Sequence, residues 1–368
     1  MMEPLNPPEM GTIAKQMLTK TLRLRRGENL LVETWTHMLP WAQAIVLEAR
    51  KLGLRTLVLY EDEATYWKSV EECKATDLGR ASDPELAALA KTDGYIFLWG
   101  PEDRPRLNAL PPEKVEALQA YNHRWYQVAE KAHLRGCRFE LGRATAPAAR
   151  LYGVPLGSWQ QEIIEASLVD PAPMAREGVR LATRLRRGRE LRIRHANGTD
   201  VTLQLAGRRP TVDDGVVDAA DVRDGNNLTT LPAGAVYVAL EERTASGRFL
   251  ANRTSYLRKG AVTGGRWTFA EGRLTEFEYL SGGEGVQESF EKASPGKDRP
   301  GFLSIGMNPK VHRAPGLEDL ERGTLLLGVG SNTFYGGKNR SNFQSWLGLA
   351  GAHVEVDGKT IVADGEVL

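Results

Sequence analysis

The first half of the chain alternates between helical and strand-like hydrophobic patterns. Apolar residues recur every three or four positions in three segments and form short continuous runs in four others, which predicts amphipathic helices between buried strands. The predicted helices span residues 11–22, 40–52 and 112–132, and the predicted strands lie at 30–32, 56–60, 95–99 and 138–141. A strand, helix and strand within about thirty residues form a right-handed βαβ unit with parallel strands. Residues 1–175 are therefore expected to form a doubly wound α/β domain.

From Glu190 onward the hydrophobic pattern has a period of two. Alternating runs flank Asn197-Gly198, Glu271-Gly272 and Asp357-Gly358. Asn-Gly between such runs is the strongest short-range signal of a β-hairpin, because both turn residues tolerate positive φ. The predicted strands are 191–194, 201–205, 267–269, 274–279, 353–356 and 360–362. Residues 176–368 are therefore expected to form a β-rich α+β domain.

Pro171 and Pro173 mark the boundary between these domains, and a helix is predicted at 174–187. This helix and the residues after it carry six arginines, Arg176, Arg180, Arg184, Arg186, Arg187 and Arg189. No aromatic residue lies among them to stack on bases. Lys plus Arg is 48 against 47 for Asp plus Glu, so the net charge of +1 attracts neither nucleic acid nor an anionic membrane. We therefore interpret the arginines as a solvated helix face and expect no nucleic-acid or membrane partner.

Two cysteines, Cys73 and Cys137, exclude a disulfide framework and a Cys-rich metal site, and both are expected to be buried as small hydrophobic residues. The N-terminal segment MMEPLNPPEMGTIAKQM has no apolar signal region, and no apolar run reaches the length of about 18 residues that a membrane span needs. We expect a soluble cytoplasmic protein.

The motifs GxxxxGK[ST], HExxH, GxSxG and CxxC are absent from the sequence, and its six histidines show no metal-ligand spacing. Because these motifs are absent, we do not expect a P-loop nucleotide-binding protein, a zincin peptidase, an α/β-hydrolase or a thioredoxin-type redox protein.

Several short motifs, in the same order along the chain, resemble those of the thermophilic aminopeptidase (aminopeptidase T) family of dimetal peptidases. Residues 231–238 resemble its Pro-x-Gly-Glu-Val segment, and residues 305–309, Ile-Gly-Met-Asn-Pro, resemble its Glu-Leu-Gly-Ile-Gly-Thr-Asn-Pro. The other similar segments are Leu317-Glu318-Asp319, Gly323-Thr324, residues 336–341, and Val356-Asp357-Gly358 with Asp364-Gly365. The resemblance covers nearly the whole chain. It implies the family's two-domain fold, a homodimer, and two metal ions held by two glutamates, two histidines and an aspartate of the C-terminal domain.

At the five positions that the resemblance aligns with these ligands, the sequence holds no anion. In the family's order the residues are Ala235, Phe302, Leu326, Gln344 and Trp346. Two dications about 3.5–4 Å apart repel by roughly 18 kcal/mol even at an effective dielectric constant of 20, and carboxylate ligands normally cancel that repulsion. We therefore expect no metal ion and no other cofactor.

A pocket could remain where the family binds its metal ions, and polar residues near the same motifs could bind a ligand or act as catalysts in it. Lys310 and His312 would face one side if their segment is extended, and either can act as a base or nucleophile without a metal. Lys338 could replace the positive charge of a metal towards a carboxylate or oxyanion. The candidate catalytic residues are Lys310, His312, Tyr335 and Glu241, and the candidate substrate-binding residues are Asn308, Asn332, Lys338, Asn339 and Gln344.

Three functions follow from this reading. The first is a metal-independent enzyme that acts on a small-molecule or peptide-like substrate in the C-terminal domain. The alternatives are a non-catalytic binding or scaffold protein and an aminopeptidase that uses unusual metal ligands.

Overall fold

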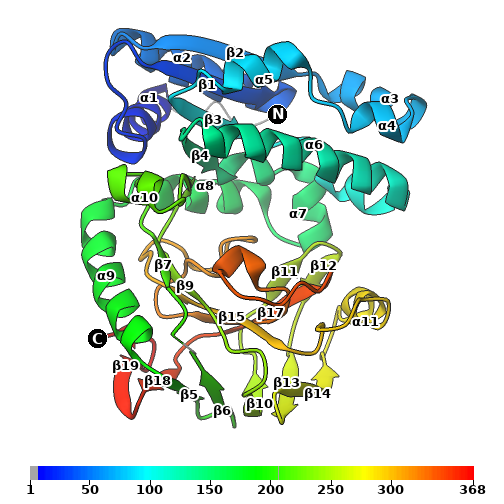
Figure 1. Cartoon of the computed structure of the whole chain (residues 1–368), viewed down its shortest axis with the longest axis vertical. Helices are drawn as coiled ribbons and strands as arrows, with labels where there is room; N and C mark the ends of the chain where they lie inside the picture. The colour runs from blue at the N-terminus through cyan, green and yellow to red at the C-terminus, as the bar shows by residue number, and fades with distance from the viewer. Residues whose placement is uncertain (1–6, 206) are drawn as a thin grey trace. The chain divides into compact units, whose positions relative to one another are not determined.

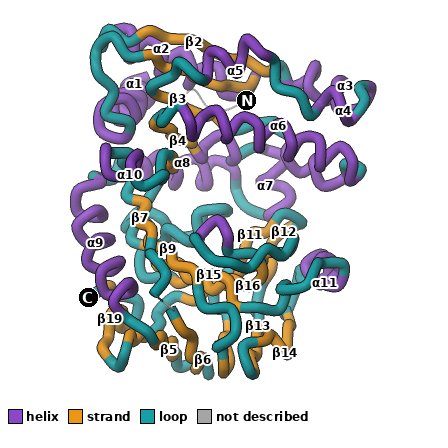
Figure 2. Tube along the Cα trace, viewed as in Figure 1, coloured by secondary structure: helices purple, strands orange, loops and turns teal. Residues whose placement is uncertain are grey.

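The computed structural model describes residues 7–205 and 207–368 (Figure 1). The chain divides into two compact units. The N-terminal unit contains the residues up to Arg150 together with Pro155–Leu168 and Gly215–Pro232, and the C-terminal unit contains Leu151–Val154, Val169–Asp214 and Ala233–Leu368. Helices dominate the first unit around one sheet, and strands dominate the second (Figure 2). The N-terminal segment used to judge a signal peptide includes residues 1–6, which lie outside the described residues.

The N-terminal unit is built on a five-stranded parallel sheet in the order β2-β1-β3-β4-β8. Its strands are β1 (Asn29–Trp35), β2 (Arg55–Glu61), β3 (Gly94–Leu98), β4 (Arg135–Phe139) and β8 (Leu228–Leu231). Its helices are α1 (Pro7–Gln16), α2 (Leu39–Lys51), α3 (Glu63–Glu72), α4 (Ala75–Leu78), α5 (Asp83–Leu89), α6 (Pro112–Lys131), α7 (Ala146–Tyr152), α8 (Leu156–Ser167) and α10 (Ala219–Arg223). Helical turns at Met17–Thr21, Thr36–Met38, Arg104–Ala109 and Glu140–Arg143 complete it.

Helices cover both faces of this parallel sheet, which confirms the predicted doubly wound α/β class. Trp41 of α2 packs edge-on against Phe139 of β4 on one face, with ring centroids 4.8 Å apart. Trp125 of α6 packs against Tyr95 of β3 on the other face at 4.6 Å. The fifth strand, β8, comes from beyond residue 175, which the expected division of the chain at that residue did not anticipate.

Two local predictions for this unit need correction. The strand expected near 138–141 is β4 at Arg135–Phe139, because its register with β3 sets its length and the following residues form a helical turn. Cys137 in that strand is buried as predicted, but Cys73 is exposed because it caps the C-terminal end of α3 on the surface. An apolar side chain does not by itself determine burial at a helix end.

The C-terminal unit contains two larger antiparallel sheets and one two-stranded ribbon, β11-β12. One sheet has the order β14-β13-β10-β6-β5-β18-β19-β20 and the other has the order β17-β16-β15-β9-β7. The strands are β5 (Glu190–Arg194), β6 (Asp200–Gln204), β7 (Thr211–Asp213), β9 (Ala235–Ala239), β10 (Ser246–Leu250), β11 (Ser255–Leu257), β12 (Gly260–Val262), β13 (Arg266–Ala270), β14 (Arg273–Glu278), β15 (Pro300–Gly306), β16 (Leu325–Gly330), β17 (Gln344–Leu349), β18 (His353–Val356), β19 (Lys359–Ala363) and β20 (Glu366–Val367). The helical elements are α9 (Pro171–Arg187), α11 (Glu284–Glu291) and a short turn at Thr333–Tyr335.

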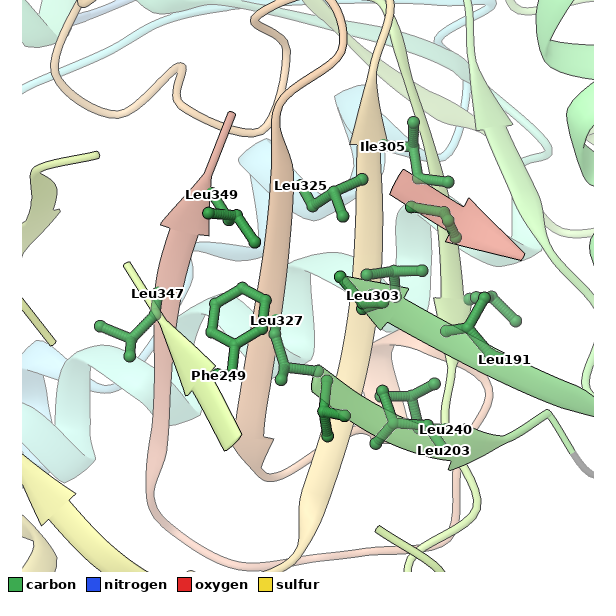
Figure 3. Close-up of a cluster of buried hydrophobic side chains, with 14 of the residues drawn as sticks. Leu191, Leu203, Leu240, Phe249, Leu303, Ile305, Leu325, Leu327, Leu347 and Leu349 are labelled. Carbon is green, nitrogen blue, oxygen red and sulfur yellow. The ribbon is translucent and has the colours of Figure 1, made fainter. Parts of the chain in front are cut away.

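The three predicted hairpins are confirmed as β5-β6, β13-β14 and β18-β19. The core of this unit lies between the two larger sheets (Figure 3). Leu303 and Ile305 of β15 meet Leu191 and Leu203 of the facing hairpin there, all fully buried. Period-two alternation therefore assigns one face of the five-stranded sheet to the core.

Helix α9 presents its arginines to solvent, as the interpretation of a solvated helix face predicted. The five arginines of α9 and the one that follows it are all exposed: Arg176, Arg180, Arg184, Arg186, Arg187 and Arg189. Its inner side is held by Glu177, whose carboxylate pairs with both terminal nitrogens of Arg322 at 2.8 Å. Within the described residues, no helix combines the length and the apolar character required to cross a membrane.

The N-terminal sheet carries an ionisable group on the face that α6 covers. Tyr95 Oη donates a hydrogen bond of 2.5 Å to Glu33 Oε2. Burial raises the pKa of Glu33 from 4.5 to about 7, against the opposing effect of the Tyr95 hydrogen bond, and Glu85 and Glu61 raise it further. Between pH 4.5 and 7 the folded protein holds a proton here that the unfolded chain releases. The stabilising contribution is therefore complete below pH 4.5 and is lost as pH rises through 7.

The substitution Glu33→Gln keeps an acceptor for Tyr95 and removes the ionisation. We expect it to raise the free energy of unfolding at pH 8 by on the order of 2 kcal/mol and to flatten its pH dependence between 4.5 and 7. Urea denaturation at pH 5 and pH 8 measures both, with the exposed Glu116→Gln as the control. A Glu33→Gln protein with the wild-type pH dependence would contradict the assignment.

Candidate functional site

The five positions aligned with metal ligands lie on one face of the five-stranded sheet in the C-terminal unit. Residues directly opposite each other on antiparallel strands share a face, and the observed pairs are Gly306 with Ala235, Phe302 with Ala239, Ser304 with Leu326, Gly328 with Trp346 and Gly330 with Gln344. The alternate residues, such as Leu303 and Leu327, point into the core on the other face (Figure 3). The sheet geometry thus places the five positions that the resemblance selects on one surface. We call it the β15-β16-β17 face.

Aromatic rings fill the middle of the β15-β16-β17 face. The Phe302 ring leans over the neighbouring strand at Gly328, where a Cβ atom would lie 2.2 Å from the Phe302 ring. Tyr335 stacks on Phe302 with ring centroids 4.2 Å apart, and Tyr237 stacks on Tyr335 at 5.7 Å. Phe302 is 2% exposed, so the aligned glutamate position is occupied by a ring that water does not reach.

A carboxylate borders this aromatic stack and is held by one of its members. Tyr237 Oη donates a hydrogen bond of 2.5 Å to Asp319 Oδ2. Burial, followed by the negative charge of Asp319, holds the pKa of Tyr237 well above its usual value, and the same two causes raise the pKa of Tyr335. Both phenols are therefore neutral hydrogen-bonding groups at physiological pH, and neither supplies a phenolate.

The residues at the aligned positions do not fit a pair of metal ions. Ala235, Phe302 and Leu326 offer no donor atom, and Gln344 uses its amide nitrogen to donate to the Ser331 carbonyl at 2.8 Å. Trp346 offers only an indole N–H, which is a donor and not a ligand. Across residues 7–205 and 207–368, no three His, Cys, Asp or Glu side chains are grouped so that they could hold a metal ion.

A cavity of about 250 Å³ opens beside the β15-β16-β17 face. It is lined by Asn252, Arg253, Thr254, Tyr256, Val311, His312, Arg313, Ala314, Glu318 and Glu321. Arg253 lies at the boundary between the cavity and the β15-β16-β17 face. A Cβ atom added to Gly348 would lie 2.9 Å from Arg253 Cβ and 3.3 Å from Leu326 Cδ2, so Arg253 and Leu326 both contact this glycine. The lining includes cationic and anionic side chains in a small volume.

Hydrogen bonds fix the charged lining of this cavity. Arg253 forms a two-pronged ion pair with Glu321 at 2.9 and 2.8 Å. Glu318 Oε1 accepts the backbone N–H of Tyr256 at 2.7 Å, and Glu318 is 8% exposed. These contacts hold both carboxylates in place, so a ligand meets a preorganised wall.

Three asparagines expected to bind substrate instead tie loops together. Asn308 Nδ2 donates to the Ala233 carbonyl at 2.7 Å, and its Oδ1 accepts the Lys310 N–H. Asn339 Nδ2 donates to the carbonyls of Gly296 and Gly330 at 2.7 Å. Asn308 is fully buried and Asn339 is half-buried, so their amides organise the loops around the site.

Asn332, the third of these asparagines, belongs to a network centred on Glu242. Asn332 Nδ2 and the backbone N–H of Lys338 both donate to Glu242 Oε1, and Arg208 pairs with both carboxylate oxygens at 2.9 and 2.8 Å. Burial alone would raise the pKa of Glu242, but the hydrogen bonds from Lys338 and Asn332 outweigh it and lower the pKa. The network holds the loop that carries Tyr335 against the end of β9.

The remaining candidates are dispersed. Lys310 lies in a turn and His312 in a bend, both exposed, so the extended segment that would have aligned them is not formed. His312 lines the cavity, whereas Glu241 Oε2 accepts the Arg243 N–H at 2.8 Å in the turn after β9. The Lys338 side chain is exposed.

Sequence reasoning missed several residues that shape the site, among them Arg253, Tyr256, Glu318, Asp319 and Glu321. Glu318 and Asp319 belong to the motif Leu317-Glu318-Asp319, which served above only to support the family resemblance. The sequence therefore already indicated two adjacent carboxylates near the site. Arg253 and Tyr256 reach the site through chain folding alone, and nothing in their local sequence indicates it.

Removal of the buried ring tests whether the aromatic stack supports the sheet. We expect Phe302→Ala to lower the free energy of unfolding by about 3–4 kcal/mol, because it leaves a cavity beneath Tyr335. Urea denaturation measures this loss. Phe334→Ala is the matched control, since Phe334 also contacts Tyr335 but is 83% exposed, and its effect should stay within about 0.5 kcal/mol. Equal effects of the two substitutions would refute the role given to Phe302.

One protein family matches this chain in sequence, and solved structures share its fold. The family described as thermophilic metalloprotease (M29) matches residues 8–299, which ends before Phe302 and thus before four of the five aligned positions. Wild-type AmpT from Thermus thermophilus has a similar structure, with a TM-score of 0.75 and 19% identity over 98% of this chain and 99% of that chain. The 2,5-dihydroxypyridine dioxygenase from Pseudomonas putida KT2440 has a TM-score of 0.64 and 14% identity, over 99% of this chain and 98% of that chain. No curated protein matches in sequence. The family match covers most of the chain, and the chain belongs to the thermophilic metalloprotease (M29) family.

Proposed function

We propose that this M29-family chain binds a small, zwitterionic, peptide-like molecule in the cavity beside the β15-β16-β17 face, without dimetal chemistry. The observation that carries the proposal is the chemistry of that face. Phe302 and Leu326 stand where the alignment expects a glutamate and a histidine, and Tyr335 stacks on the first of them.

The cost of a metal pair at these side chains supports the proposal. Two adjacent dications need anionic ligands to offset their repulsion and the loss of their hydration shells. Two carboxylates border this face: Asp213 lies opposite Ala235 on β7, and Asp319 is bound by the phenol of Tyr237. Movement of Asp319 towards a metal would break that hydrogen bond and still leave the other positions without a charge.

The lining of the cavity supports a ligand that carries both charges. Arg253 keeps one terminal nitrogen, Nη1, outside its ion pair with Glu321, and this nitrogen and Arg313 can approach a carboxylate. Glu318 can approach an ammonium group. Tyr256 and Val311 add apolar area for a short side chain. A volume of about 250 Å³ suits an amino acid or a short peptide rather than a folded partner.

A metal-independent enzyme acting on the same ligand is the second candidate. The observation that favours it is the position of His312 in the cavity wall, because imidazole is the side chain most often used as a general acid or base. Glu318 and Glu321 line the same cavity, so a substrate there would lie near both the imidazole and the carboxylates.

The binding proposal is tested with the dipeptide leucylglycine by titration calorimetry. We expect saturable binding, and at least about tenfold weaker binding of the N-acetylated, C-amidated dipeptide, which has lost both charges. Thr254→Trp should abolish binding by filling the cavity, while the exposed Thr275→Trp should leave it unchanged. Absence of binding to the wild type, or equal affinity in both variants, would overturn the proposal.

The absence of dimetal chemistry is tested separately with leucine p-nitroanilide. We expect no hydrolysis that depends on added zinc, cobalt or manganese, and no stoichiometric metal in the purified protein. Stoichiometric metal together with hydrolysis that a chelator abolishes would establish a metallopeptidase instead. Turnover of leucylglycine that resists a chelator and disappears in His312→Ala would favour the second candidate.

A further inference from the structure

The carboxyl ends of the parallel strands form one edge of the N-terminal sheet, and the order of the strands reverses there. The chain runs from β1 to β2 on one side and then returns to β3 on the other side of β1, which gives the order β2-β1-β3-β4-β8 (Figure 1). Open α/β sheets bind small ligands outside the carboxyl ends of their strands, next to such a reversal. A ligand of this unit would therefore meet the residues that follow β1, β3 and β4.

Three arginines surround the tryptophan that follows β3. The guanidinium carbons of Arg104, Arg143 and Arg138 lie 4.7, 5.4 and 5.7 Å from the centroid of the Trp99 ring. We call these four residues the Trp99 cluster. Each of the four side chains is half-buried, so solvent reaches the cluster. Three cations around one ring repel one another, and an anion among them would relieve that repulsion.

One buried carboxylate contacts the Trp99 cluster. Glu140, which follows β4 and is 5% exposed, accepts the Trp99 Nε1–H at 3.0 Å and Arg143 Nη1 at 2.8 Å. Arg138 Nη2 donates instead to the neutral hydroxyl of Tyr126, and Arg138 belongs to no ion pair within the part of the chain that the structure describes. The cluster and Glu140 together carry three positive charges and one negative charge, which leaves an excess of two positive charges.

Other hydrogen bonds fix the loop that leads to Arg104. Glu63 accepts the backbone N–H groups of Glu102 and Asp103 at 2.8 and 3.2 Å. Thr145 Oγ1 donates to the Glu102 carbonyl at 2.8 Å. Because this loop is held before any ligand arrives, binding costs less ordering of the chain than it would at a loose loop.

A buried histidine nitrogen lies at the same edge without a partner. His37 follows β1, and its Nε2 lies 3.1 Å from the Gly142 carbonyl, which can only accept a hydrogen bond. Nε2 therefore carries the proton, and Nδ1 of the neutral ring is an acceptor. Nδ1 is buried, and no group in residues 7–205 and 207–368 donates to it. Gly142 packs on Trp99, since a Cβ atom on Gly142 would lie 2.6 Å from the Trp99 carbonyl oxygen. The acceptor thus adjoins the Trp99 cluster, and a hydroxyl group would complete it.

We propose that the carboxyl edge of the N-terminal sheet binds a phosphate monoester, whose phosphate group lies at the arginines of the Trp99 cluster. A phosphate monoester carries about −1.5 to −2 charges at pH 7, which matches the excess positive charge of the cluster. Its oxygens accept the paired N–H groups of a guanidinium in a two-pronged geometry. A hydroxyl group on its alcohol part supplies the donor that His37 Nδ1 lacks. The site is independent of the cavity in the C-terminal unit and of the function proposed for it.

Titration calorimetry of the full chain tests the site with two phosphate monoesters, glucose 6-phosphate and adenosine 5′-monophosphate. We expect saturable binding of one equivalent, and the tighter of the two identifies the alcohol part as a sugar or a nucleoside. Glucose and adenosine lack the phosphate and should bind at least about tenfold more weakly. Inorganic phosphate should bind several-fold more weakly than the tighter ester, because it lacks the alcohol part. Absence of binding of both esters and of inorganic phosphate would overturn the proposal, and inorganic phosphate that binds as tightly as both esters would overturn the assignment of an ester.

Substitutions test the place of the phosphate group. Arg138→Gln and Arg104→Gln each remove one cation from the Trp99 ring and should each weaken binding of the tighter ester at least about tenfold. Arg138→Lys keeps the charge without the two-pronged geometry and should give an intermediate affinity. Arg124→Gln removes the same charge from an exposed position on α6 of the same unit and should leave the dissociation constant within about twofold.

A substitution at His37 tests the alcohol part separately. His37→Phe should remove the preference for the ester over inorganic phosphate and leave the affinity for inorganic phosphate unchanged. Circular dichroism melting shows which variants remain folded, and the two glutamine variants of the cluster are independent of each other. Equal affinity of the ester for Arg124→Gln and for a folded Arg138→Gln or Arg104→Gln would overturn the proposal.

Discussion

The strict alternation of side chains across the five-stranded sheet of the C-terminal unit is the constraint on which the site depends. One face of this sheet closes the largest core of the unit, where Leu303, Ile305 and Leu327 are fully buried. Every residue that is not used there belongs to the opposite face. A one-residue shift in strand register would therefore move the core side chains of that strand to the site face and destroy the core. The chemistry of the site can change only by substitution at fixed positions.

Those positions hold a packed aromatic surface in this chain. Phe302 reaches across Gly328, and Tyr335 covers it, so the space over two strands is filled by side chains from β15 and from the following loop. Polar groups lie at the margin of this surface, where Arg253, Glu318 and Glu321 line a cavity with fixed geometry. A scaffold of the M29 family thus presents apolar contacts in the centre and paired charges at the side.

The sequence predicted most of the fold because its signals are local. Hairpin turns such as Asn197-Gly198 and the helical spacing of residues 40–52 act over a few residues, and they identified the elements closely. The strand β8 escaped prediction because it joins the N-terminal sheet from far along the chain, which no local pattern encodes. The five aligned positions could be placed on one face only once the register was known. Asn308 and Asn339 appeared to be ligand-binding groups, since a sequence does not tell an amide that faces a ligand from one that satisfies a loop carbonyl.

The ring of Phe302 over Gly328 also limits which single substitutions this face can accept. A glutamate at position 302 alone would stand between Leu326 and Tyr335 with no cation to neutralise it, and such an isolated buried anion destabilises the native state. A histidine at position 326 alone would gain no metal either. Several substitutions would have to be made together before the face could hold a metal ion, so no single substitution at these positions creates a metal site.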